Sequence, residues 1–205
     1  MKRILVLSII PLLLIQMSLL AQNEKIRLAG RHTLFMESGF KSNSTTSVVV
    51  NSSTVETKAG FIGGINYGYW FDEQWGLTLS VGLFGAETST KFNGVETSAI
   101  IPVLFGIRFY PESFSLGSIG RPYAGLSLGQ YMGFATKVKS VFNTETVNEP
   151  AFGGEASVGV DLFVASWFKI GPKFSYHFLG DFSEVIGTKK NLSGASFSVE
   201  FGFVL

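Results

Sequence analysis

Apolar residues alternate with small or polar residues at a period of two through most of the chain after residue 60. This period places successive side chains on opposite faces of a β-strand. It predicts seven strands, over residues 61–71, 75–86, 97–109, 122–134, 152–164, 168–178 and 195–205. A weaker eighth strand is predicted over about 31–40, with Leu34 and Met36 facing outward because Glu37 has the other parity.

The two faces of the seven stronger strands differ sharply in composition. The apolar face has 45 positions, none of them charged, whereas the other face has 39 positions that include 12 glycines. That second face carries six charged residues, namely Arg108, Glu155, Asp161, Lys169, Lys173 and Glu200. A soluble sandwich or barrel would carry many more charges on its solvated face. The contrast therefore predicts apolar side chains that face lipid and small or polar side chains that face inward.

We predict an all-β fold, an eight-stranded antiparallel up-and-down transmembrane β-barrel over residues 22–205. Strands in hydrocarbon must pair all their backbone groups, so the sheet has to close. A Lys or Arg on the lipid face near the midplane would cost about 2–4 kcal/mol, which accounts for the uncharged face. Short connections at 72–74, 111–120 and 165–167 alternate with longer ones at 41–57, 89–95, 137–151 and 181–192. This alternation is typical of periplasmic turns and extracellular loops.

Two features complicate the predicted strands. Pro102 and Pro172 lie inside strands and cannot donate a hydrogen bond to a neighbour, so we expect β-bulges there. Segment 97–109 is apolar on both parities, because Ile100 and Leu104 fall on the face predicted to point inward. The register of this strand, like that of the strand at 31–40, stays open.

Residues 1–21 have the pattern of a secretory signal peptide. Lys2 and Arg3 precede an apolar run from Ile4 to Ile15, and Ala21 supplies a small residue at the expected cleavage site. Removing this segment leaves 16 − 2 = 14 basic residues against 15 acidic ones. A nearly neutral chain disfavours nucleic acid as a partner. The absence of cysteine excludes a disulfide framework.

Three stretches resemble a known family. Ile101-Pro102-Val103-Leu104 followed by Arg108-Phe109-Tyr110 resembles one strand of the PorT-like outer-membrane β-barrel domain family, and Arg121-Pro122-Tyr123-Ala124-Gly125 resembles the start of another. The family is related in architecture to OmpA/OmpX-type barrels of Gram-negative bacteria and includes components of secretion systems. The final segment resembles the signal read by the barrel-assembly machinery, through Phe197, Val199, Phe201, Phe203 and Leu205. That signal usually ends in Phe or Trp, so Leu205 departs from it.

The sequence predicts no catalytic, cofactor-binding or metal-binding residues and no enzyme. We expect the six inward charges to form a structural cluster, with Lys173 near Glu200 and Asp161 near Lys169. An ion path along these charges is the alternative. His177 and Ser175 share the inward parity, with Asp181 just beyond, and we interpret them as rim polarity rather than a nucleophile and base.

The predicted function is a structural or interaction role in the outer membrane, with no open pore. The expected partners are outer-membrane lipid, the barrel-assembly machinery, and an extracellular or envelope protein bound through loops 41–57, 137–151 and 181–192. A secretion-apparatus component, a narrow channel and a lipid-modifying enzyme are the alternatives.

Overall fold

The computed structural model describes residues 26–205 except 51–52, 92–93, 118, 141–142 and 187–188. The predicted signal peptide, residues 1–21, lies outside this range. The strands are β1 (His32–Val50), β2 (Ser53–Trp70), β3 (Trp75–Lys91), β4 (Gly94–Phe109), β5 (Gly120–Ser140), β6 (Asn143–Ala165), β7 (Phe168–Leu179) and β8 (Gly194–Val204). A short 3-10 helix, η2 (Glu112–Phe114), lies between β4 and β5. None of the helical residues described forms a segment long and apolar enough to cross a bilayer.

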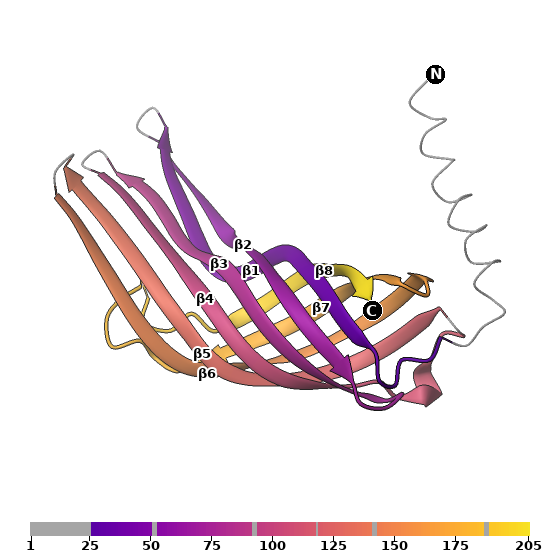
Figure 1. Ribbon diagram of the computed structural model, residues 1–205. Coiled ribbons are helices and arrows are strands. Elements are labelled where there is room, and N and C mark those ends of the chain that lie inside the picture. Colours follow the sequence, from indigo (N-terminus) through magenta and orange to yellow (C-terminus); the bar gives the residue numbers. More distant parts are fainter. Residues whose placement is uncertain (1–25, 51–52, 92–93, 118, 141–142, 187–188) are drawn as a thin grey trace, which may run out of the picture.

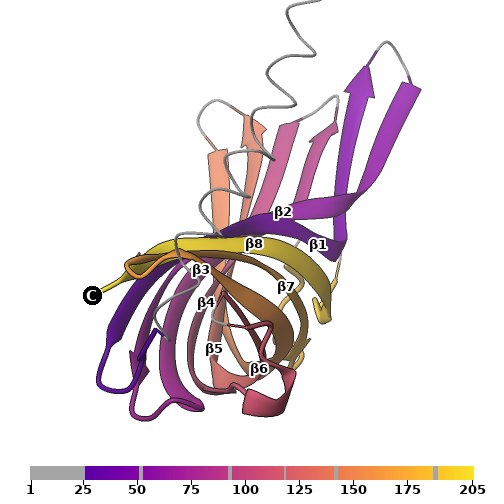
Figure 2. The same ribbon diagram turned by 90° about the vertical axis from the view of Figure 1, so that its right-hand side faces the viewer.

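The strands close into a barrel in which each pairs antiparallel with the next. β1 completes the ring by pairing with β8, from Thr33 opposite Val204 to Lys41 opposite Ser196. The predicted all-β, eight-stranded antiparallel barrel is therefore confirmed. Figure 1 shows long hairpins at one end, which we call the hairpin end, and Figure 2 looks toward the opposite end. There the short connections between β2 and β3 and between β6 and β7 lie, so we call it the turn end.

The predicted parity holds around the barrel. β8 alternates strictly between exposed and buried residues, β7 does so after the half-buried Phe168, and Leu34 and Met36 point outward on β1. Ile100 and Leu104 are buried inside, which settles the orientation of β4. On β7 the outward set runs from residue 168 to residue 178, a distance of ten residue steps. At about 3.3 Å per residue and a tilt near 40°, this band is about 25 Å tall, the height expected of a membrane barrel.

Strands β1 to β6 are each at least three residues longer than predicted. Most of the segments 41–57 and 137–151, which we expected to be loops, are strand, and they form the β1–β2 and β5–β6 hairpins. In Figure 1 these hairpins and the β3–β4 hairpin rise beyond the barrel at the upper left. Near its tip β1 also pairs in parallel with β3, from Thr45 opposite Glu87 to Val48 opposite Thr90.

The bulges expected at the two prolines are absent. Beside Pro102 the β3–β4 ladder skips two pairs and resumes in the same register, and the β6–β7 ladder does the same beside Pro172. On their other sides Pro102 pairs with Tyr131 and Pro172 with Val199. A proline lacks one donor, which points toward one neighbour only. The barrel therefore tolerates two short gaps without an extra residue.

The interior has three layers, rather than the uniformly small and polar filling that we predicted. An upper apolar layer at the hairpin end contains Ile62, Phe84, Ile100, Leu104, Tyr131, Ala135, Ala151, Leu179, Phe182, Ile186 and Leu192. A lower apolar layer at the turn end contains Leu28, Trp70, Tyr110, Tyr123, Phe163 and Val204. The inward-facing charges form a charged layer between them. Large side chains close both ends because inward glycines on neighbouring strands leave room for them.

Candidate functional site

The charged layer is built from five strands. All six predicted charges are there and buried: Arg108 on β4, Glu155 and Asp161 on β6, Lys169 and Lys173 on β7, and Glu200 on β8. The structure adds Glu37 of β1, which sequence reasoning placed on the inward face but left out of the cluster. Counting Lys41 in the upper layer, the buried charged residues of the described chain are four basic and four acidic. The interior is therefore electrically balanced.

Arg108 and Glu200 form a two-pronged ion pair across the lumen. The Arg108 Nη1 and Nη2 atoms donate to the Glu200 carboxylate at 2.8 and 2.6 Å, and the Tyr123 hydroxyl donates to the same carboxylate at 3.2 Å. The guanidinium also lies 4.7 Å from the Phe35 ring centroid and 4.4 Å from that of Tyr123. Bidentate geometry of this kind is the strongest form of ion pair, and it ties β4 to β8.

Lys173 is the centre of a second group. Its Nζ atom lies 2.9 Å from Glu37 Oε2, 2.8 Å from Glu155 Oε1 and 3.8 Å from Glu200 Oε1. The predicted proximity of Lys173 and Glu200 is therefore confirmed, but the closest partners of Lys173 come from β1 and β6. The contact with Glu37 depends on the closure of β1 against β8, which no local sequence pattern reveals.

The predicted pair of Asp161 and Lys169 is also confirmed. The Lys169 Nζ atom donates to Asp161 Oδ2 at 2.8 Å, and the Tyr110 hydroxyl donates to the same oxygen at 3.1 Å. The Lys169 ammonium lies 4.2 Å from the Phe35 ring centroid. The other carboxylate oxygen, Asp161 Oδ1, is buried and has no hydrogen-bond partner among the described residues.

His177 lies inside the barrel, and the prediction that it belongs to the rim is wrong. It is buried, with Nδ1 3.2 Å from the Tyr131 hydroxyl and Nε2 3.2 Å from Ser196 Oγ. The Ser196 hydroxyl is in turn 2.7 Å from that of Ser175. Asp181 does not join this group, because it accepts a hydrogen bond from Asn191 in the β7–β8 connection. The structure thus does not assemble His177, Ser175 and Asp181 into one site.

The β7–β8 connection closes the hairpin end as a lid, which we define as residues 180–193. Phe182, Ile186 and Leu192 of the lid are almost fully buried in the upper apolar layer. Lys41 Nζ donates to the Leu192 carbonyl at 2.7 Å. We expected loop 181–192 to be an exposed binding loop; in the structure its apolar residue Ile186 is at 0% exposure, whereas the neighbouring Val185 is 40% exposed.

The N-terminal segment closes the turn end. Leu28 is buried in the lower apolar layer, and Glu73 accepts hydrogen bonds from the backbone N–H groups of Leu28 and Ala29 at 3.0 and 3.2 Å. Arg121 donates to Glu73 Oε2 at 3.2 Å and to the Ile26 carbonyl at 2.6 Å. Partial burial raises the pKa of Glu73, but these donors outweigh it and hold the pKa below its usual value. We call these contacts of Glu73 and Arg121 with residues 26–29 the clamp. It was not predicted from the sequence, because apolar and polar residues do not alternate over residues 26–31.

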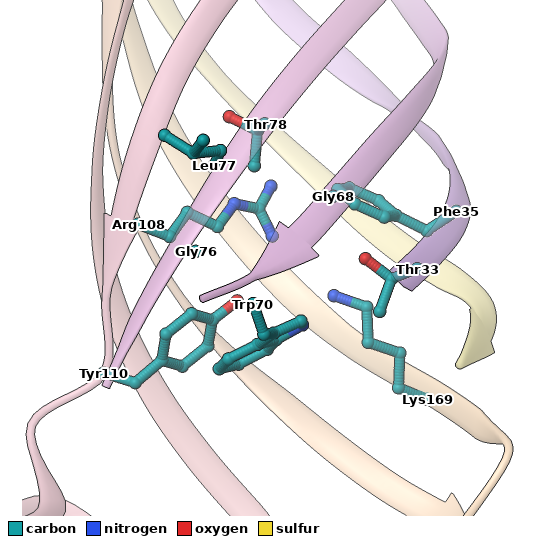
Figure 3. Close-up of a pocket in the computed structure, with 10 residues that line it drawn as sticks. All are labelled: Thr33, Phe35, Gly68, Trp70, Gly76, Leu77, Thr78, Arg108, Tyr110 and Lys169. Carbon is teal, nitrogen blue, oxygen red and sulfur yellow. The ribbon is translucent and has the colours of Figure 1, made fainter. Parts of the chain in front are cut away.

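A small cavity remains between the charged layer and the lower apolar layer. Figure 3 shows Arg108 and Lys169 approaching it from opposite sides, with Trp70 and Tyr110 below the Arg108 guanidinium. Its wall also includes Thr33, Phe35, Gly68, Gly76, Leu77 and Thr78. A volume of about 10 Å³ is room for roughly one water molecule. No group of three or more potential metal ligands occurs in the part of the chain that the structure describes.

The outward face carries the residues predicted as a C-terminal assembly signal. Phe197, Val199, Phe201, Phe203 and Leu205 all point outward along or just after β8. The Phe203 ring stacks on Trp167 at 5.9 Å between centroids, beside Phe168. These aromatic residues lie at the turn end, as an interfacial girdle requires.

Comparisons with solved structures identify the architecture. The chain is similar to Ail, the attachment invasion locus protein of Yersinia pestis, with a TM-score of 0.55 and 13% identity over 86% of this chain and 99% of that one. It is similar to Neisserial surface protein A, with a TM-score of 0.56 and 14% identity over 85% and 97% of the two chains. For the outer membrane protein OprG from Pseudomonas aeruginosa the values are 0.56 and 12%, over 89% and 99%.

No family model and no curated protein matches the sequence. At these identities the likeness concerns the fold, so no residue role passes from those proteins to this chain. The closed ring of eight antiparallel strands agrees with the comparisons. The chain has the eight-stranded fold of outer-membrane β-barrel proteins.

Proposed function

We propose that the protein resides in the outer membrane, after cleavage near Ala21, as a closed barrel that binds a partner outside the cell through its hairpin end. The observation that carries this proposal is the length of β1–β6. They continue beyond the outward apolar band at the hairpin end. In contrast, β7 stops at Leu179 and β8 starts at Gly194, both close to the edge of the band. Extra strand beyond the bilayer is not needed to anchor a barrel, so it supports a role outside it.

The hairpins reach far from the band. β1 continues from the exposed Phe40 to Val50, and β6 begins at Asn143, nine residues before the exposed Phe152. At about 3.3 Å per residue these extensions span about 30 Å along the strand. The backbones of these extensions are paired in β-ladders. A backbone that is already paired loses little conformational entropy when it binds a partner.

The filled interior supports the absence of an open pore. The upper apolar layer, the charged layer and the lower apolar layer occupy the lumen in succession. Side chains just fill a barrel of eight strands. His177 and Ser175 lie beneath the lid, where neither lipid nor solvent reaches them. This burial supports a non-catalytic role.

The similarity to Ail supports a surface role only in general terms. The name of that protein describes attachment, and both chains have the same closed architecture. A role in secretion is the rival proposal, because the PorT-like family, which the segments at 101–110 and 121–125 resemble, includes components of secretion systems. In either case the outward residues of β8 would be read by the barrel-assembly machinery during insertion.

The test compares the full chain with a variant whose three long hairpins are shortened to the edge of the apolar band. Both chains are produced in a Gram-negative host, and a heat-dependent change in gel mobility verifies that each barrel is folded. On a surface coated with extracellular-matrix protein, we expect cells with the full chain to be retained. Cells with the shortened chain should behave like cells without the protein. Equal retention of both would refute the proposal.

Two further measurements separate the rivals. The purified full chain should give no single-channel steps in planar bilayers, because the lumen is filled. Deleting the chain from its own cell should leave surface secretion intact. Conductance steps would favour the narrow channel, and lost secretion would favour the secretion apparatus.

A further inference from the structure

The connection between β4 and β5 differs from the others at the turn end. It extends from Tyr110 to Ile119, whereas β6 and β7 are separated by two residues. Its central part carries two large apolar side chains that are the most exposed of the described connections, Phe114 at 67% and Leu116 at 63%. Two large exposed apolar side chains only two positions apart are unusual in a turn that faces water, and they indicate a contact surface.

The end of the connection turns back and pairs with Gly120, the first residue of β5. Gly117 adopts a φ of 65°, which glycine readily allows, and reverses the chain. Leu116 N–H then donates to the Gly120 carbonyl at 2.8 Å, and Gly120 N–H donates to the Leu116 carbonyl at 3.3 Å. Ile119, just before β5, pairs with β6, because the Phe163 N–H donates to the Ile119 carbonyl at 2.7 Å.

The position of Gly120 shows which side of the wall is covered. Gly120 has the same parity as Pro122 and the exposed Ala124, so a side chain there would point outward. A Cβ atom on Gly120 would lie 2.8 Å from the Cβ atom of Leu116. The Leu116 side chain therefore lies on the outward side of Gly120, at the start of β5. Leu116 is not part of the lower apolar layer, in which Leu28 and its neighbours fill the lumen at the turn end.

We propose that residues 111–117 form an anchor that inserts Phe114 and Leu116 into the interfacial region of the phospholipid leaflet at the turn end. Phe109, the last residue of β4, packs against Trp75 at 4.7 Å between ring centroids, so an aromatic pair of the outward band directly precedes this segment. Glu112 is the one charged residue of the segment. Aromatic and leucine side chains at this depth bind lipid by apolar burial. This continuity with the band favours lipid over a periplasmic protein as the occupant.

The cysteine-free sequence permits a direct test. Single-cysteine variants Phe114→Cys and Leu116→Cys are labelled with an environment-sensitive fluorophore and reconstituted into phosphatidylcholine vesicles. The references are Leu126→Cys on the outward face of β5 and Glu184→Cys in the exposed part of the lid. A Glu112→Cys variant controls for the turn itself. Heat-dependent gel mobility verifies folding of every variant.

Labels at positions 114 and 116 should emit at shorter wavelength than the label at 184. They should also be quenched by lipids with a nitroxide near the headgroup, more than by lipids with a nitroxide deep in the chain. The label at 126 should show the opposite depth preference. Emission and quenching at both 114 and 116 equal to those at 184 would overturn the anchor.

Two outcomes separate this inference from the membrane placement on which it rests. If position 126 is not quenched either, the barrel itself is not in the bilayer and the proposed function fails as well. If 126 is quenched while 114 and 116 are not, and the latter cross-link to an envelope protein in cells, the segment is a protein contact and the lipid anchor is wrong.

Discussion

The middle of the lumen and its two ends are filled by different physical means. In the charged layer, residues on β1, β4, β6, β7 and β8 are held together by ion pairs such as Arg108–Glu200. At the ends, short pieces of chain insert apolar side chains, Phe182 and Ile186 from the lid and Leu28 from the N-terminal segment. Ion pairs specify which strands face each other across the lumen, and the apolar layers keep water away from them. The ion pairs and the apolar layers therefore depend on each other, because removing one partner of an ion pair that is sealed from water leaves an uncompensated buried charge.

The largest effect is expected from removing Lys173. Lys173→Ala leaves the Glu37 and Glu155 carboxylates facing each other in a sealed interior without their shared cation. The free energy of unfolding should fall by about 3–5 kcal/mol. Urea titration followed by tryptophan fluorescence measures it, and an unchanged midpoint would show that the pairing is not structural. A triple variant, Lys173→Met with Glu37→Gln and Glu155→Gln, removes all three charges and should lose less.

A thermodynamic cycle on Arg108 and Glu200 sharpens the comparison within the charged layer. Arg108→Met strands a buried carboxylate, whereas Arg108→Met combined with Glu200→Leu removes both charges. The coupling energy of two residues in contact is expected to be about 0.5–3 kcal/mol, so the double variant should be more stable than the sum of the single variants implies. Strict additivity in urea titrations would contradict the direct pair.

The lid should respond locally. Phe182→Ala removes a fully buried ring from the upper apolar layer and should cost about 3 kcal/mol where the lid packs. Because few strand pairs hold the lid, we expect faster amide hydrogen exchange over residues 180–193 with a smaller change in global unfolding. Val185→Ala, on the exposed side of the same lid, is the matched control. A uniform rise of exchange in all strands would mean that the lid is not a separate unit.

The smallest effect is expected at the turn end, where the clamp is partly exposed. The pKa of Glu73 is lowered in the folded chain, so its contribution is present above the carboxyl pKa of the unfolded chain and is lost as pH falls through the lowered value. For an exposed pair this is less than about 1 kcal/mol. Glu73→Gln should remove the pH-dependent part of this stabilisation. The measurement is the hydrogen-exchange protection of the Leu28 and Ala29 amides as a function of pH. Identical pH profiles in both proteins would exclude the role of Glu73.

The architecture was predictable because lipid and lumen impose opposite demands on successive residues. Leu34 and Glu37 on β1 and the whole of β8 follow from that rule alone. The alternation rule did not predict features that depend on how the barrel closes, namely the contact of Glu37 with Lys173 and the depth of His177 inside the lumen. Leu28 and the lid lie outside any alternating segment, so their insertion had no signal. Large residues on the inward face, such as Trp70 and Phe84, were the available hint of the apolar layers.

The tip of β1 has a consequence for the order of assembly. Near Thr45–Val48 this strand leaves the neighbourhood of β8 and lies between β2 and β3, as the separate tilt of the first hairpin in Figure 2 indicates. The outer part of β1 cannot reach its final position until β3 is extended beside it. The outer part of the first hairpin in the chain is therefore completed only after β3 is in place.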